Sequence, residues 1–96
     1  MFAVIFSADI AQMDEEYTVT AKRMRDLAVN EYGCLNIRSL SENDKEITIS
    51  YWNSLEEIQA WKNNSEHKLA QKVGQSRWYK KYHVEIVEVL REYGNI

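Results

Sequence analysis

The side chains of this 96-residue chain that could do nucleophilic or metal chemistry are few and far apart in the sequence. Ser7, Asp9, His67 and His83 supply the residue types of a hydrolase triad, but no Gly-x-Ser-x-Gly turn surrounds any serine. His67, His83 and Cys34 could ligate a metal, but the chain has no Cys-x-x-Cys or His-Glu-x-x-His motif. The three glycines are isolated, so no glycine-rich phosphate loop is present. We therefore expect no hydrolase triad, metal centre or nucleotide loop.

Aromatic residues with polar tips are more frequent, and they gather in the second half of the chain. Aromatic rings provide apolar walls for a small molecule, while hydroxyl, amide and imidazole groups fix its orientation. We expect such a pocket between the sheet and the second helical region. Its expected walls are Trp61, Trp78, Tyr51, Tyr79 and Tyr82, and its expected polar groups are His67, Gln71 and Ser7. The alternative, equally open on residue chemistry alone, is that these rings form the core or a subunit interface.

The segment 77–83 interleaves cations with aromatic rings, as proteins that bind single-stranded nucleic acid do. RNA-recognition domains have the strand and helix order derived below, with a glycine, a basic residue and exposed aromatics on their third strand. Here the segment 45–52, which contains the third strand, has no glycine, and the net charge is −3. We therefore expect no nucleic-acid partner, and we expect Trp78, Tyr79 and Tyr82 to pack the join between the last helix and the last strand.

Apolar periodicity assigns these residues to elements of a single domain, 1–96. Asp14 is expected to cap an amphipathic helix that stops before Gly33. Ser54 and Glu57 fit a capping box, and Ser65 is expected to cap a further helix. The expected strands are 2–6, 34–40, 47–52 and 84–90, the expected helices are 15 to 31–32, 55–62 and 65–74, and 7–13 is expected to be a loop.

The resulting order, β-α-β-β-α-β, predicts an α+β ferredoxin-like fold, in which a four-stranded antiparallel sheet carries helices on one face. The first strand, Phe2–Phe6, is apolar at every position, so both of its faces are expected to be buried. The helices cover one face, and a second copy of the sheet related by a two-fold axis is the economical cover for the other. The sequence therefore predicts a homodimer.

Composition narrows the class of protein further. Hydrophobic residues make up 45% of the chain and charged residues 28%, as in ordinary globular proteins. Cys34 is the single cysteine, which excludes an internal disulfide and is typical of a small buried hydrophobe. The longest apolar run, Phe2–Phe6, is far shorter than the roughly 20 residues of a membrane helix. We expect a cytoplasmic protein with no membrane partner.

The segment 58–74 resembles the signature region of the antibiotic biosynthesis monooxygenase (ABM) domain family. It contains Ala-Trp, then Glu-His-x-x-Ala-Gln, with a glycine soon after. The run 78–84, the opening strand 2–6 and the pair Tyr51-Trp52 continue the resemblance over nearly the whole chain. The resemblance implies a dimeric α/β barrel in which two ferredoxin-like sheets pack face to face, each subunit with its own pocket.

Characterised relatives in that family oxidise quinol or anthrone-like aromatics with molecular oxygen and neither metal nor flavin. The resemblance thus implies a cofactor-independent monooxygenase acting on a small aromatic or lipophilic molecule. Such chemistry needs a base and a dry pocket, and His67 is the candidate base. Trp61 and Tyr79 are candidate walls or donors, and Gln71 is a candidate orienting group. The alternative within this fold is a non-catalytic ligand-binding or stress-related protein.

The haem-degrading branch of the same family is a weaker match. Its pattern combines an asparagine in the first strand, a helix tryptophan, and a histidine ten residues after that tryptophan. Trp61 matches the tryptophan, but Ser7 stands at the asparagine position and Gln71 at the histidine position. Because glutamine does not replace an axial histidine on iron, we do not expect haem degradation.

Overall fold

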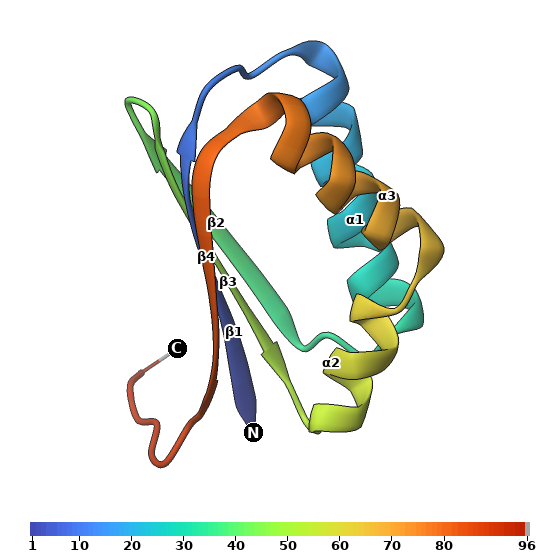
Figure 1. Cartoon of the computed structure of the whole chain (residues 1–96). Coiled ribbons are helices and arrows are strands. Elements are labelled where there is room, and N and C mark those ends of the chain that lie inside the picture. Colours follow the sequence, from blue (N-terminus) through green and yellow to red (C-terminus); the bar gives the residue numbers. More distant parts are fainter. Residues whose placement is uncertain (96) are drawn as a thin grey trace.

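The computed structural model describes residues 1–95, apart from the side chain of Ser65, and forms one sheet with its helices on one side (Figure 1). The elements in chain order are β1 (Phe2–Ile10), α1 (Glu15–Glu31), β2 (Asn36–Glu42), β3 (Lys45–Trp52), α2 (Leu55–Lys62), α3 (Ser65–Val73), the π-helical η1 (Gly74–Trp78) and β4 (Tyr79–Glu88). This order confirms the predicted ferredoxin-like α+β fold.

β1 lies inside the sheet, whose strand order is β2-β3-β1-β4 with antiparallel neighbours throughout. In this register Ile5 lies opposite Ile49 of β3 and Glu85 of β4. The helices lie against one face, and the segment after β4 lies on the side of the sheet away from them (Figure 1). Because side chains alternate along a strand, each strand residue belongs either to the helix-covered face or to the open face.

Side-chain caps fix where α1 and α2 begin, as the sequence predicts. The carboxylate of Asp14 accepts a hydrogen bond from the amide of Tyr17 at 2.8 Å. The hydroxyl of Ser54 accepts from the amide of Glu57 at 3.1 Å and donates to the Glu57 carboxylate at 3.3 Å. Each cap satisfies a backbone donor that the helix itself leaves unpaired.

The cap of α3 differs from the prediction, because Asn64 rather than Ser65 fills that position. The amide oxygen of Asn64 accepts a hydrogen bond from the amide of His67 at 3.1 Å. The side-chain nitrogen of Asn64 donates to the hydroxyl of Tyr32 at 2.8 Å. This second bond connects the start of α3 to the end of α1.

β1 extends beyond its apolar stretch at its C-terminal end, and β4 extends beyond its apolar stretch at its N-terminal end. β1 continues to Ile10 through residues expected as a loop, and β4 begins at Tyr79 instead of residue 84. Asp9 lies opposite Lys45 of β3 and Lys81 of β4. Its carboxylate contacts their ammonium groups at 2.9 and 3.5 Å. Ladder hydrogen bonds and cross-strand charge pairs therefore continue the sheet where hydrophobic patterning stops.

The hairpin of β2 and β3 is also displaced from its predicted bounds. The amide of Cys34 donates to the carbonyl of Ala28 at 3.1 Å, which closes α1 and delays β2 until Asn36. The hairpin is tight, with Asn43 at φ 55°, and β3 therefore begins at residue 45 instead of 47.

A cluster of buried core residues surrounds Trp52, which is fully buried at the end of β3. Ala28, Cys34 and Ile58 complete this cluster, so it joins the sheet to α1 and α2. The indole nitrogen of Trp52 donates to the hydroxyl of Ser50 at 2.9 Å, which satisfies its one polar group. Within residues 1–95, no helix combines the length and apolar character needed to cross a membrane.

Gly33 ends α1 in a conformation that other residues rarely adopt. Its φ is 83°, and a Cβ there would meet the carboxylate of Glu57. We predict that Gly33→Ala lowers the free energy of unfolding by about 1–2 kcal/mol, the usual cost of a left-handed L-residue. Urea denaturation at fixed protein concentration measures the change, and Gly94→Ala, with open space around the new methyl group, is the matched control. Equal stability of the two variants would contradict this prediction.

Candidate functional site

A cavity of about 510 Å³ lies between the sheet and the helices. Its volume is typical of small-molecule sites, which span roughly 300–1,000 Å³. The sheet contributes helix-facing side chains from all strands, and α1, α2, α3 and η1 close the other side. The strand residues that line it are Val4, Phe6, Ile37, Ser39, Glu46, Thr48, Ser50, Trp52, Tyr79, Tyr82, Val84 and Ile86.

One end of the cavity is a stack of aromatic rings from α2 and the start of α3. The imidazole of His67 lies nearly parallel to the indole of Trp61, with ring centroids 4.4 Å apart and an angle of 20° between the rings. The Trp61 ring lies 5.7 Å from that of Tyr32 and 6.4 Å from that of Trp52. Because Asn64 caps the turn that carries His67, this end is a fixed aromatic wall.

His67 is in a poor environment for a charged imidazole. Burial lowers its pKa from the ordinary value of 6.5, while the nearby backbone of Lys62 and Trp61 partly opposes the shift. Its Nδ1 is buried and has no hydrogen-bond partner among the described residues. At neutral pH His67 is therefore an uncharged ring, a weaker base than a free histidine.

The other end of the cavity holds a buried carboxylate and two tyrosines. Glu46 is 9% exposed, and the hydroxyl of Tyr17 donates a hydrogen bond to its Oε1. Burial, followed by the hydrogen bond to Glu46, raises the pKa of Tyr17. Burial and the charge of Glu46 raise the pKa of Tyr79 to about 12. Both phenols are thus protonated donors at neutral pH.

The π-helix η1 positions Tyr79 at this end. A Cβ on Gly74 would lie 2.5 Å from the ring of Tyr79, so the ring packs where only glycine leaves room. The Tyr79 ring lies 5.3 Å from that of Phe6 and 6.1 Å from that of Tyr82. Tyr82 is 43% exposed and accepts a hydrogen bond from Gln75 at 2.7 Å, so the cavity reaches solvent beside β4.

The structure brings together most of the residues expected to form the pocket. The cavity is lined by Trp61, His67, Gln71, Trp78, Tyr79 and Tyr82. The placement of Ser7 and Tyr51 differs from the expectation. Ser7 follows Phe6, which lines the cavity, so strand alternation puts Ser7 on the open face. Tyr51 precedes Trp52 on β3 and lines a hollow on that same open face.

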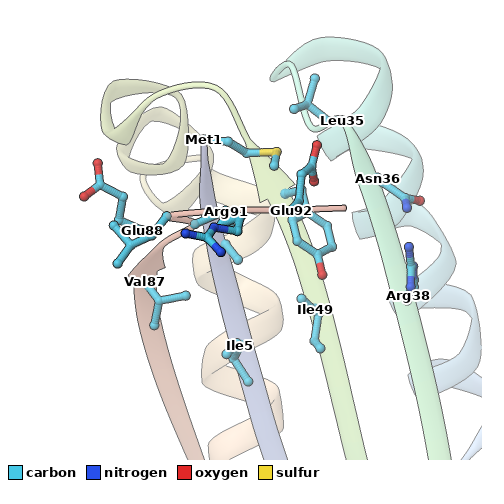
Figure 2. A pocket seen from close by; sticks show the side chains of 14 residues that line it. Met1, Ile5, Leu35, Asn36, Arg38, Ile49, Val87, Glu88, Arg91 and Glu92 are labelled. Carbon is cyan, nitrogen blue, oxygen red and sulfur yellow. The ribbon is translucent and has the colours of Figure 1, made fainter. Parts of the chain in front are cut away.

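The open face is apolar over the middle of the sheet. Figure 2 shows the side chains of Ile5, Ile49 and Val87 on neighbouring strands, pointing away from the helices. Ile47, on the same face of β3, is 49% exposed. The segment after β4 crosses one end of this face, and the amide of Val89 donates to the carbonyl of Met1 at 3.0 Å.

Glu46 and Tyr17 are the site residues that sequence reasoning missed. A period-2 pattern was available on β3, because Glu46 shares its face with Thr48, Ser50 and the buried Trp52. That pattern places a carboxylate under the helices. Tyr17, the hydrogen-bond partner of Glu46 in α1, has no comparable sequence pattern, since it is only one of several inward residues of an amphipathic helix.

The basic segment 77–83 does not form a free cationic surface in the structure. Lys45 and Lys81 contact Asp9, and the ammonium of Lys80 lies 3.8 Å from the carboxylate of Asp44. The ring of Tyr79 faces the cavity instead of solvent. Across residues 1–95, no group of three or more His, Cys, Asp or Glu side chains is arranged to hold a metal ion.

Solved structures with this architecture define the fold class. SnoaB, a cofactor-independent oxygenase from Streptomyces nogalater, superposes with a TM-score of 0.81 at 8% identity, covering 98% of this chain and 97% of that one. A candidate antibiotic biosynthesis monooxygenase from Nitrosomonas europaea gives a TM-score of 0.76 at 12% identity, covering 95% of this chain and all of that one. These likenesses show a shared fold, and together with the family match below they confirm the resemblance to the ABM family.

A family model described as monooxygenase af470-like matches residues 6–89, and the chain belongs to that family. The uncharacterized protein YqjZ of Bacillus subtilis is 40% identical over 92 residues, which is 95% of this chain and 81% of that protein. The matched segment contains both ends of the cavity.

The lowered pKa of His67 gives a testable pH dependence. The unfolded chain binds a proton near pH 6.5 and the folded chain only at lower pH, so stability should fall as pH drops below 6.5. We predict an NMR titration midpoint below 6.5 for the His67 imidazole, identified by its absence in His67→Gln. When the pH falls from about 7.5 to about 5.5, the free energy of unfolding should decrease less in His67→Gln than in the wild type. A His67 midpoint at or above 6.5 would contradict the burial argument.

Proposed function

We propose that this protein is a monooxygenase that oxidises a small aromatic or lipophilic molecule, of the quinol or anthrone kind, with molecular oxygen and no bound cofactor. One observation carries the proposal. This chain, a member of the monooxygenase af470-like family, has a cavity of about 510 Å³ with aromatic walls and hydrogen-bonding groups at both ends. Residues 1–96 act as a single domain in this proposal.

The reaction balances without a redox group on the protein. For an anthrone, a base removes a proton from the methylene carbon, and the resulting anion transfers its electrons to oxygen and forms a carbon–oxygen bond. The peroxide takes up a proton, and loss of water leaves a carbonyl. One oxygen atom of O₂ enters the product and the other leaves as water. The protein must exclude water, orient the ring and supply an acceptor for the proton.

Trp61 and His67 are the proposed catalytic residues at the aromatic end. Their parallel rings, 4.4 Å apart, offer a flat surface against which a substrate ring can stack. Gln71, which lies on α3 with His67, is the proposed orienting group.

The second candidate function is non-catalytic binding of a similar molecule. The lowered pKa of His67 favours it, because a weaker base takes a substrate proton less readily.

Oxygen uptake tests the proposal. Purified protein is assayed with a panel of quinols, anthrones and related phenols, with a chelator and no added flavin. We predict protein-dependent uptake that survives the chelator and falls by about tenfold or more in Trp61→Ala, because the substrate loses its stacking surface. His67→Ala should also slow uptake. Lys68→Ala, an exposed change on α3, is the control and should match the wild type.

The outcomes of this assay separate the two candidate functions. Uptake that disappears with the chelator would contradict the cofactor-free mechanism. Binding of a panel compound without any uptake would support the non-catalytic protein.

We also propose a homodimer in the cytoplasm, formed by the open faces of two sheets. The half-exposed Ile47 and its apolar neighbours on this face support a second copy as the cover. Cys34 is a free buried thiol, which suits a reducing compartment.

If the protein is a dimer, light scattering should give a mass in solution of twice that of the 11.4 kDa chain. Ile49→Asp puts a charge at the centre of the open face and should give a monomer, because an unpaired charge is costly to bury. Val19→Asp, at an exposed position of α1, is the matched control and should remain dimeric. A wild-type monomer, or a dimeric Ile49→Asp variant, would contradict this interface.

A further inference from the structure

We propose that Glu46 is the group that recognises the ligand, by accepting a hydrogen bond and then a proton from an acidic hydroxyl on a planar aromatic molecule. The recognition step requires only that the cavity binds such a molecule. The proton transfer rests on the oxygenase function proposed above.

Glu46 is the acidic side chain of the cavity lining, and its charge is poorly compensated by the protein. Tyr17 donates to Oε1, and no other described side chain hydrogen-bonds to this carboxylate. The adjacent Lys45 contacts Asp9 on the opposite side of the strand. A carboxylate nine-tenths buried normally has several donors or a cationic partner. The second oxygen of Glu46 therefore has acceptor capacity that a ligand hydroxyl can fill.

The surroundings of Glu46 select a flat ligand. The ring of Phe6 lies 5.3 Å from that of Tyr79 and 6.1 Å from that of Tyr82, and these side chains share the cavity floor with the carboxylate. Aromatic rings at these separations leave faces and edges for a further ring to pack against. A hydroxyl on the edge of such a ligand can then point at Glu46.

Glu46 is better placed than His67 to take the proton. The ring of His67 is covered on one face by Trp61, and burial lowers its pKa, so it takes up a proton less readily than a free histidine. Tyr17 holds one oxygen of Glu46 and leaves the other available. In the step proposed, the ligand is the enol form of the anthrone: its hydroxyl proton moves to Glu46 and the electron pair stays on the ligand oxygen, delocalised over the ring. This gives the same anion as loss of the methylene proton. The protonated Glu46 then returns this proton to the peroxide formed from O₂, and water leaves as described above.

Naphthol and its methyl ether test the recognition step, because they differ in the hydroxyl donor and share the ring. Isothermal titration calorimetry measures both dissociation constants. We expect wild-type protein to bind naphthol about tenfold more tightly than the ether, as expected for a hydrogen bond to a charged acceptor. In Glu46→Gln the preference should fall to about twofold or less, because the amide is a neutral acceptor and also presents donors. Circular dichroism checks that the variant is folded.

Glu56→Gln is the matched control, since it makes the same change at an exposed position in the first turn of α2. It should keep the wild-type preference. Glu46→Gln should also slow anthrone-dependent oxygen uptake by about 100-fold or more, the usual contribution of a general base. A folded Glu46→Gln protein that keeps the preference for naphthol would overturn the assignment, as would a wild type that binds both probes equally.

The two proposals fail in different ways. If wild-type protein prefers naphthol through Glu46 but consumes no oxygen with any substrate, recognition stands and the oxygenase function fails. If oxygen uptake occurs and is unchanged in Glu46→Gln, the function stands and Glu46 is not its base. If neither naphthol nor its ether binds, both proposals fail, because the cavity does not take planar aromatics.

Discussion

Strand alternation in the middle of the sheet is the constraint on which the rest of this structure depends. β1 is paired on both sides, so it cannot slip by one residue without moving every side chain to the other face. Phe6 therefore belongs to the cavity and Ser7 to the open face, and the same rule separates Trp52 from Tyr51. One register thus determines both the lining of the cavity and the surface available to a second subunit.

The sequence predicts the fold well because its signals are local. Asp14 and Ser54 mark helix starts through hydrogen bonds within one turn, and the confirmed element order follows from them. The strand ends are less predictable, since Asp9 is held in β1 by lysines from two other strands. The cavity residues on α2, α3 and β4 were predictable by type, whereas the pair of Tyr17 and Glu46 depends on a contact between distant segments.

The two ends of the cavity differ in the kind of chemistry they allow. At one end a neutral His67 lies flat on Trp61, where shape and stacking dominate. At the other end Glu46 lies among protonated phenols, where charge and hydrogen bonding dominate. The substrate proposed above needs both environments, because its ring stacks on Trp61 while its hydroxyl meets Glu46.

The π-helix η1 has a consequence for how this family can vary in length. A π-turn accommodates one more residue than an α-turn does, and it often marks an insertion that was retained at a functional site. Removing one residue from 74–78 would restore regular winding and advance β4 by one position against β1. Lys80 would then face inward where Tyr79 now does, and His83 and Glu85 would replace Tyr82 and Val84. The spacing between α3 and β4 therefore decides which side chains of β4 line the cavity.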